Sequence, residues 1–228
     1  MTLPLGRRRY TLFMRRSLVL IAALAAPTFA AEIKLFNGKD LNGWSRLARH
    51  EGQPDHAPGF KIENGMLITD PQAPEDDIWY TREKIGNATI RVVYKVDSER
   101  ANSGIFIRIP EPPKSEDDAI NKGIEVQIDQ GDDDWHCTGV LYSMVKAKAR
   151  PSKPIGEWNT MVIEMKGPRT IVTVNGVLVT DCDGVTPAPE KVKSYEPDRG
   201  RRPDTGYIAV QHHGGKGVVT FKEIVLIR

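Results

Sequence analysis

Short apolar and β-branched runs, bounded by Gly, Pro, Asn and Asp, recur from residue 33 to the end of the chain, and helical periodicity is scarce. They predict strands at about residues 33–36, 59–63, 66–69, 78–81, 88–96, 103–109, 123–129, 138–142, 158–165, 169–175, 177–180, 206–211 and 217–227. Two Asn-Gly pairs, at residues 64–65 and 175–176, are typical of tight hairpins, and residues 157–180 are expected to form a meander. Hairpin links without crossover helices predict an all-β fold, a two-sheet antiparallel sandwich.

Two segments do not fit strands. Residues 110–122 are a polar, Pro-rich stretch expected to form a loop, and residues 181–204 are long and poor in apolar side chains. Loops of this length in a compact domain are usually functional or flexible. Because no internal repeat or linker divides residues 31–228, they are predicted to form a single domain.

The first thirty residues have the layout of a secretory signal peptide. Five arginines between positions 7 and 16 precede the apolar run SLVLIAALAAPTFA, which is too short to span a bilayer and ends in small residues. We therefore expect residues 1–30 to be removed and the protein to be exported, periplasmic or secreted, with no membrane span. Cys137 and Cys182 would then meet oxidising conditions; the sequence leaves their pairing open, as it does the oligomeric state.

Removal of the signal peptide would reverse the sign of the net charge. The full chain has a formal charge of +2, whereas residues 31–228 keep 27 of its 32 Lys and Arg and all 30 Asp and Glu, which gives −3. Nucleic-acid binding requires a concentrated positive face, so this balance gives no support to a nucleic-acid partner.

Polar side chains share one face of the predicted strand in GIEVQIDQG, residues 123–131. Because side chains alternate along a strand, the three apolar residues face one way and Glu125, Gln127 and Asp129 the other. In NSGIFIRI, inward isoleucines at 105, 107 and 109 leave Arg108 facing out, and in GYIAVQHHGG the outward phase includes Gln211 and His213. If these strands are neighbours, six side chains converge on one patch: Arg108, Glu125, Gln127, Asp129, Gln211 and His213.

A face that merely meets water would give the same alternation. Such a face is usually filled with Lys, Glu, Thr and Ser, whereas this one has Arg, Glu, Gln and His, which bind sugar hydroxyls or titrate near neutrality. Glu125 and Asp129 also invite comparison with the paired carboxylates of glycosidases, although Gln127 stands where the laminarinase-type signature has a second acid. His212, of the opposite phase, is assigned to a turn or an edge.

The run Asp132-Asp133-Asp134-Trp135-His136 offers two further candidates. Its carboxylates could hold a hard cation, but the spacing is not that of a calcium loop, so a solvated turn is favoured. Trp135 is the best candidate for a sugar-stacking platform. No metal ligand is assigned, and the sequence has no Gly-rich phosphate loop, nucleophile elbow or cysteine-pair metal motif.

Six segments, in order along nearly all of the predicted domain, resemble the motifs of the 3-keto-disaccharide hydrolase domain family. They are LFNGKDLNGW (35–44), NSGIFIR (102–108), GIEVQID (123–129), GEWNTMVIEMKG (156–167), VTVNGVLV (172–179) and GYIAVQHHGGKGVVTFKEIVLIR (206–228). The resemblance implies a concanavalin A-like lectin/glucanase fold, a jelly-roll sandwich with a concave face for a carbohydrate substrate. His212 departs from it, because an acidic residue is expected before the histidine.

The resemblance also implies cleavage of glycosides whose sugar carries a ketone at C3. Such a ketone acidifies the C2 proton, so that a base removes it, the aglycone at C1 leaves by β-elimination and water adds back. Implied roles are base or acid for Glu125 or His213, oxyanion and hydroxyl partners for Arg108 and Gln127, and positioning for Gln211 and Asp129. A divalent cation on the enolate is an open alternative.

Two other functions remain hypotheses at this point, since a fold does not fix a function. The chief rival is a non-catalytic carbohydrate-binding module on the same scaffold. A structural or partner-binding sandwich is the third, and it would need an exposed apolar patch. Glu125→Gln should abolish turnover in an enzyme, and change only affinity in a binding module.

Overall fold

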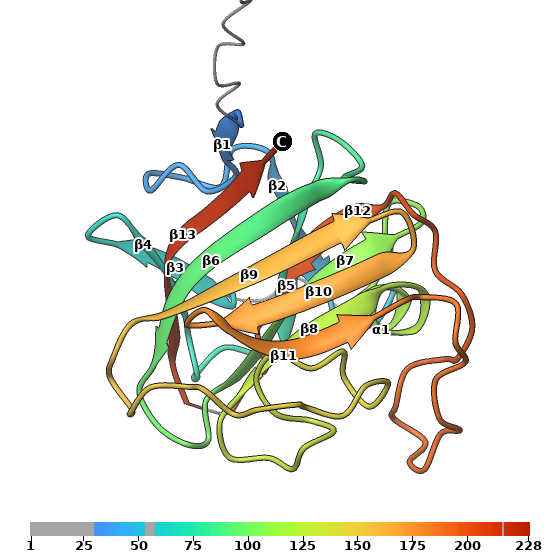
Figure 1. The fold of residues 1–228 in the computed structure, drawn as a ribbon. Coiled ribbons are helices and arrows are strands. Elements are labelled where there is room, and N and C mark those ends of the chain that lie inside the picture. The colour runs from blue at the N-terminus through green and yellow to red at the C-terminus, as the bar shows by residue number, and fades with distance from the viewer. Residues whose placement is uncertain (1–29, 53–57, 216) are drawn as a thin grey trace, which may run out of the picture.

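Two antiparallel β-sheets pack face to face in the computed structural model, which describes residues 30–52, 58–215 and 217–228 (Figure 1). The larger sheet has the order β11 (Val177–Cys182), β10 (Arg169–Val174), β9 (Asn159–Lys166), β6 (Ala88–Val96), β13 (Val219–Ile227), β4 (Met66–Thr69) and β3 (Phe60–Glu63), with β1 (Glu32–Lys34) also paired to β13. The smaller sheet has the order β2 (Trp44–Ala48), β5 (Asp76–Tyr80), β12 (Tyr207–Val210), β7 (Asn102–Ile109) and β8 (Ile124–Asp129). The predicted all-β, two-sheet sandwich is confirmed.

Both predicted Asn-Gly hairpins are confirmed by their backbone angles. Asn64 and Gly65 have φ values of 51° and 77°, and Asn175 and Gly176 have 51° and 79°. These positive angles match the right-handed twist of the flanking strands. The second turn joins β10 to β11, and β9 pairs with β10, so the predicted meander over residues 157–180 is also confirmed.

The apolar side chains of the strands meet between the two sheets and form the core. Ile124, Val126 and Ile128 of β8 belong to the main core cluster, as predicted from GIEVQIDQG. A second, smaller cluster covers part of the opposite face of the smaller sheet, where α1 (Glu116–Lys122) places Ala119 against Phe106 and Ala209. We call this face, which is turned away from the larger sheet, the outer face.

The structure differs from the prediction in three places. Strand β2 was not predicted, and residues 110–122 contain helix α1 instead of being loop throughout. Ser115 caps this helix by accepting a hydrogen bond from the Asp118 amide, and the first turn is acidic, which favours the positive end of the helix dipole. Residues 138–142 run beside β8 with a single bridge, Val126 to Leu141, instead of forming a strand.

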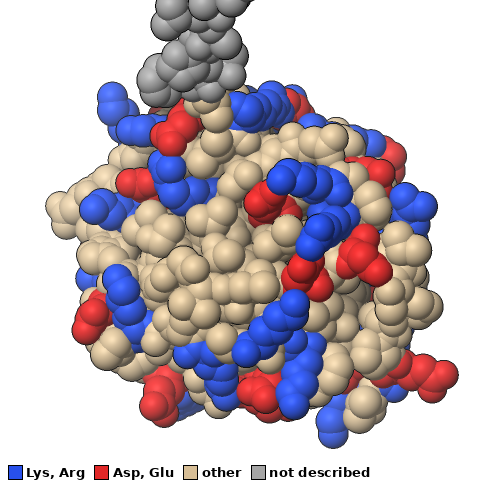
Figure 2. Space-filling view, viewed as in Figure 1, with Lys and Arg blue, Asp and Glu red and all other residues tan. Residues whose placement is uncertain are grey.

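The predicted signal peptide lies outside the described residues, apart from Ala30. Within the described part of the chain, no helix is long and apolar enough to cross a membrane. Both cysteines, Cys137 and Cys182, are free thiols. On the face carried by the larger sheet, Lys and Arg side chains lie among Asp and Glu (Figure 2).

Candidate functional site

A row of polar residues crosses four strands on the outer face of the smaller sheet. The β5–β12 register pairs Val210 with Ile78, and its continuation by one residue places Asp77 of β5 opposite Gln211. The Gln211 amide donates to the Gly104 carbonyl of β7 at 2.9 Å, and Gly104 pairs in turn with Gln127 of β8. Glu125 is the next outward residue of β8, so four segments distant in sequence bring these groups together.

Helix α1 adds a carboxyl group to this row. Glu116, its first residue, is only 1% exposed, and its Oε1 accepts from Gln211 Nε2 at 3.5 Å. Arg49 Nη1 donates to both Glu116 oxygens at 3.2 Å and also pairs with Glu75. Glu75 in turn contacts His213, with 3.2 Å between Oε1 and Nδ1. A continuous network therefore runs from His213 through Glu75, Arg49 and Glu116 to Gln211.

Three carboxyl groups of the site have raised pKa values. Burial, and then the nearby Glu116, raise the pKa of Glu125 to about 8. Burial raises the pKa of Glu116 to about 7, although Arg49 opposes the shift. Burial, with Glu116 the next cause, raises the pKa of Asp77 well above its usual range. Protonated carboxyl groups are therefore present in this site at neutral pH.

Three buried oxygen atoms of the site have no hydrogen-bond partner among the described residues: Asp77 Oδ2, Glu125 Oε1 and Gln211 Oε1. The other Asp77 oxygen accepts from the His212 amide at 2.9 Å. Buried polar groups nearly always have partners, so each unpaired one requires an explanation. The three unpaired oxygens therefore mark this face as a candidate ligand site.

Most of the residues predicted from strand phase lie where that phase puts them. Glu125, Gln127 and Gln211 are buried on the outer face, and His213 lies at the end of the network described above. Asp129 shares their phase but holds the turn after β8, because its Oδ1 accepts from the Gly131 and Asp132 amides at 2.8 and 3.2 Å. These two bonds give Asp129 a structural role in the turn.

The prediction that Arg108 faces the same patch is wrong. Arg108 has a positive φ of 59°, and the β7–β12 register shifts beside it, so the alternation slips by one residue. Its guanidinium points between the sheets and donates to Thr170 Oγ1 and to three backbone carbonyls, those of Gly167, Arg169 and Pro203. For the same reason Ile109, predicted to face inward, packs in the outer cluster.

The guanidinium of the site belongs to Arg49, which was not among the predicted site residues. Glu75, Asp77 and Glu116 were not predicted either. Glu116 lies in the segment taken for a loop, and Asp77 lies just before the predicted start of its strand. In DDIWY, Asp77 has the same strand phase as Trp79, and this alternation could have predicted the face on which Asp77 lies. No local pattern marks Arg49 or Glu75.

His212 supports the site from behind, and its assignment to a turn or an edge is wrong. The side chain is fully buried just after β12, with Nε2 2.8 Å from the Asp70 carbonyl oxygen and the ring edge against Phe60. Burial lowers its pKa. Gly59 packs so tightly on the ring that a Cβ there would lie 2.8 Å from Cγ. His212 therefore positions Asp77 through its backbone amide.

The loop after β8 contains Trp135 and the acidic run. Trp135 is partly buried, and its amide donates to Asp133 Oδ1 at 2.7 Å. Farther along the loop, the Tyr142 amide donates to the Glu125 carbonyl at 3.0 Å, which fixes the loop along the edge of β8. The role of Trp135 as a sugar platform stays a prediction.

One group of side chains in the described ranges has the spacing to hold a metal ion, namely Asp132, Asp133 and His136, with ligand atoms within 4.8 Å of one another. His136 Nδ1 already lies 2.8 Å from Asp133 Oδ1, which also accepts the Trp135 amide. These are the bonds of a polar turn, and they favour the solvated-turn interpretation. The carboxyl groups of the outer face are not part of this group.

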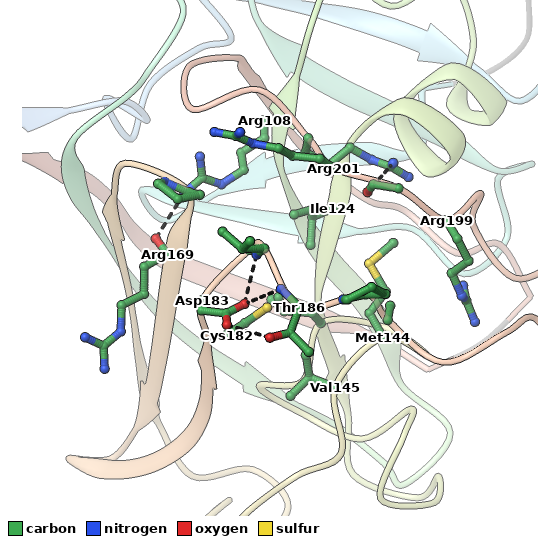
Figure 3. Close-up of a pocket in the computed structure, with 18 of the residues that line it drawn as sticks. Arg108, Ile124, Met144, Val145, Arg169, Cys182, Asp183, Thr186, Arg199 and Arg201 are labelled. Carbon is green, nitrogen blue, oxygen red and sulfur yellow. Dashed lines mark hydrogen bonds between the residues drawn. The ribbon is translucent and has the colours of Figure 1, made fainter.

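A cavity of about 640 Å³ lies on the other side of β8, between the sheets (Figure 3). Ile124, Met144 and Val145 give it an apolar wall, and the engaged Arg108 lies at one side. Asp183 is occupied by the Val185 and Thr186 amides. The charged groups described in this cavity are largely engaged in hydrogen bonds and ion pairs with other residues of the protein. We therefore place the candidate active site on the outer face.

Structures of known proteins share this fold. A provisionally assigned glycosyl hydrolase from Parabacteroides distasonis ATCC 8503 is 23% identical, with a TM-score of 0.68 over 87% of this chain and 98% of that one. A carbohydrate-binding module from Bacillus subtilis is 12% identical, with a TM-score of 0.51 over 80% and 93% of the two chains. A non-specific endo-β-1,3(4)-glucanase of glycoside hydrolase family 16 is 10% identical, with a TM-score of 0.53 over 90% and 93%. These likenesses confirm the predicted jelly-roll fold.

The sequence itself identifies the family. No curated protein matches the chain. The profile of the 3-keto-disaccharide hydrolase family, described as the 3-keto-alpha-glucoside-1,2-lyase-like domain, matches residues 31–227 and confirms the resemblance seen in the motifs. The chain therefore belongs to this family of glycoside-related proteins.

Proposed function

We propose that the protein is an exported enzyme that cleaves 3-keto-glycosides, including 3-keto-disaccharides, by proton removal at C2, elimination of the C1 substituent and hydration. The observation that carries the proposal is the buried, protonated Glu125 beside two further carboxyl groups, in a site where Glu125, Asp77 and Gln211 each have one unpaired oxygen. Family membership supports the class of substrate.

Glu125 is assigned the role of general acid. With a pKa of about 8 it holds a proton at pH 7, which it gives to the oxygen of the departing aglycone as the C1–O bond breaks. The resulting double bond joins C1 and C2. Water then adds its hydroxyl group to C1 and a proton to C2, which leaves the free 3-keto sugar.

His213 is assigned the role of base for the C2 proton. Glu75 contacts its Nδ1, and a carboxylate in this position orients an imidazole and stabilises its protonated form. Arg49, which bridges Glu75 and Glu116, places a positive charge beside these two acids and would stabilise the enolate. Gln211 and Asp77 would accept hydrogen bonds from sugar hydroxyl groups through their unpaired oxygens.

The experiment compares release of the aglycone from 3-keto-glucosides and from the unoxidised parents, with and without a chelator. We expect release from the keto substrates alone, and exchange of the C2 hydrogen with solvent deuterium. Release from neither substrate, or equal release from both, would overturn the proposal.

Glu125→Gln separates the enzyme from the rival carbohydrate-binding module. Because Gln cannot donate an acidic proton, we expect kcat to fall by about 100-fold or more while calorimetric binding of the sugar persists. Glu190→Gln, at an exposed position, is the matched control and should keep full activity. A Glu125→Gln protein with undiminished turnover would exclude Glu125 as the acid.

A further inference from the structure

Gly104 of β7 lies directly beneath the side chain of Glu125. A Cβ atom added to Gly104 would lie 2.7 Å from Glu125 Cγ and 2.9 Å from Cδ, and closer still to Oε1. Carbon atoms that are not bonded normally approach to about 3.5–4.0 Å. The carboxyl group of Glu125 can therefore occupy this place only because residue 104 has no side chain.

The backbone at this position does not need a glycine. Gly104 is not among the residues with positive φ, and it lies in the regularly paired part of β7, opposite Gln127 of β8. Glycine in the interior of a strand weakens it, because it has no side chain to pack and loses more entropy on folding. The reason for glycine here is space for Glu125 and not backbone conformation.

The space under Glu125 decides where its carboxyl group lies. The side chain lies across β7, whose Gly104 carbonyl binds the Gln211 amide, and it is within electrostatic range of Glu116. With a side chain at residue 104, Glu125 would have to turn away from β7 and from this cluster. The unpaired Oε1 would then leave the site.

We infer that Gly104 is a positioning residue, whose missing side chain holds the Glu125 carboxyl group against β7 beside Gln211 and Glu116. The effect of Gly104 on catalysis rests on the proposed function, whereas its effect on packing does not. The inference is therefore tested in two independent ways.

The first test is a double-mutant cycle of urea unfolding with Gly104→Ala, Glu125→Ala and the double variant. We expect Gly104→Ala to lower the unfolding midpoint in the presence of Glu125, and to leave it unchanged or raise it in the Glu125→Ala background, where the clash is gone. If Gly104→Ala does not fold, the double variant should recover folded protein. Equal effects in both backgrounds, or no recovery, would overturn the inference.

The second test is the pH profile of turnover on 3-keto-glucosides. We expect Gly104→Ala to lower kcat by about 100-fold with little change in KM, since a small misplacement of a reacting group has such a cost. The ionisation near pH 8 should move to lower pH, because the displaced carboxyl group meets water. A purely structural role would leave the profile in place and overturn the inference. A wild-type protein without turnover would refute the proposed function, and the unfolding cycle would still decide on Gly104.

Discussion

At the scale of single residues, burial separates the acids of the site from those of the surface. Asp183 is exposed and bound by Thr186 and two amides, and these bonds lower its pKa. Glu125 is buried, and one of its carboxyl oxygens, Oε1, has no hydrogen-bond partner in the described ranges. Burial raises the pKa of this carboxyl group to about 8. Two carboxyl groups thus differ in charge at neutral pH: Asp183 is an anion, whereas Glu125 is a neutral acid.

The raised pKa of Glu125 predicts a pH dependence of stability. Between pH 4.5 and about 8 the folded protein keeps a proton that the unfolded chain releases, so the free energy of unfolding falls as the pH rises through this window. Glu125→Gln, which stays neutral, should remove a decline on the order of a few kcal/mol. Urea unfolding at pH 5 and pH 8.5 measures it, with Glu190→Gln as the control. An equal decline in Glu125→Gln would contradict the assignment of a protonated Glu125.

At the scale of elements, helix α1 and the irregularity in β7 determine which groups reach the site. The helix brings Glu116 over the outer face, and the positive φ at Arg108 turns that guanidinium away from it. The helix had readable signals, since Ser115 precedes three acids, but it is short and follows a Pro-rich stretch. The slip at Arg108 has no sequence signal, because a strictly alternating pattern predicts the opposite face.

The cap of α1 provides a prediction for this element. Ser115→Ala removes the acceptor of the Asp118 amide and should lower the free energy of unfolding by about 1 kcal/mol. Since Glu116 is the next residue, the variant should also raise KM for the keto substrate. Chemical denaturation and steady-state kinetics measure the two effects. Ser115→Asp, which keeps an acceptor, should restore stability, and failure to do so would count against the cap.

At the scale of the whole molecule, the fold was predictable and the complete site was not. Hairpin turns and alternating strands are local signals, so the sandwich and the faces of β8 and β12 followed from the sequence. The order of strands in the smaller sheet is non-local, and it is this order that places β5 and its Asp77 beside β12. Arg49 and Glu75 reach the site from connections whose paths no periodicity records.

The predicted signal peptide gives a test at the same scale. Expression of the full chain in a bacterium should yield exported protein whose first residue lies close to position 31, as read by N-terminal sequencing. Replacement of the five arginines before the apolar run by glutamine should reduce export. A protein that retains Met1 in the cytoplasm would refute the proposed localisation.

The acids, the amide and the guanidinium of the site come from segments that begin at residue 49 and end at residue 213. No fragment of the sandwich contains the whole arrangement, so catalytic competence should arise only in the last step of assembly. Turnover would then report on completion of folding as faithfully as a spectroscopic probe, and loss of activity in urea should coincide with global unfolding.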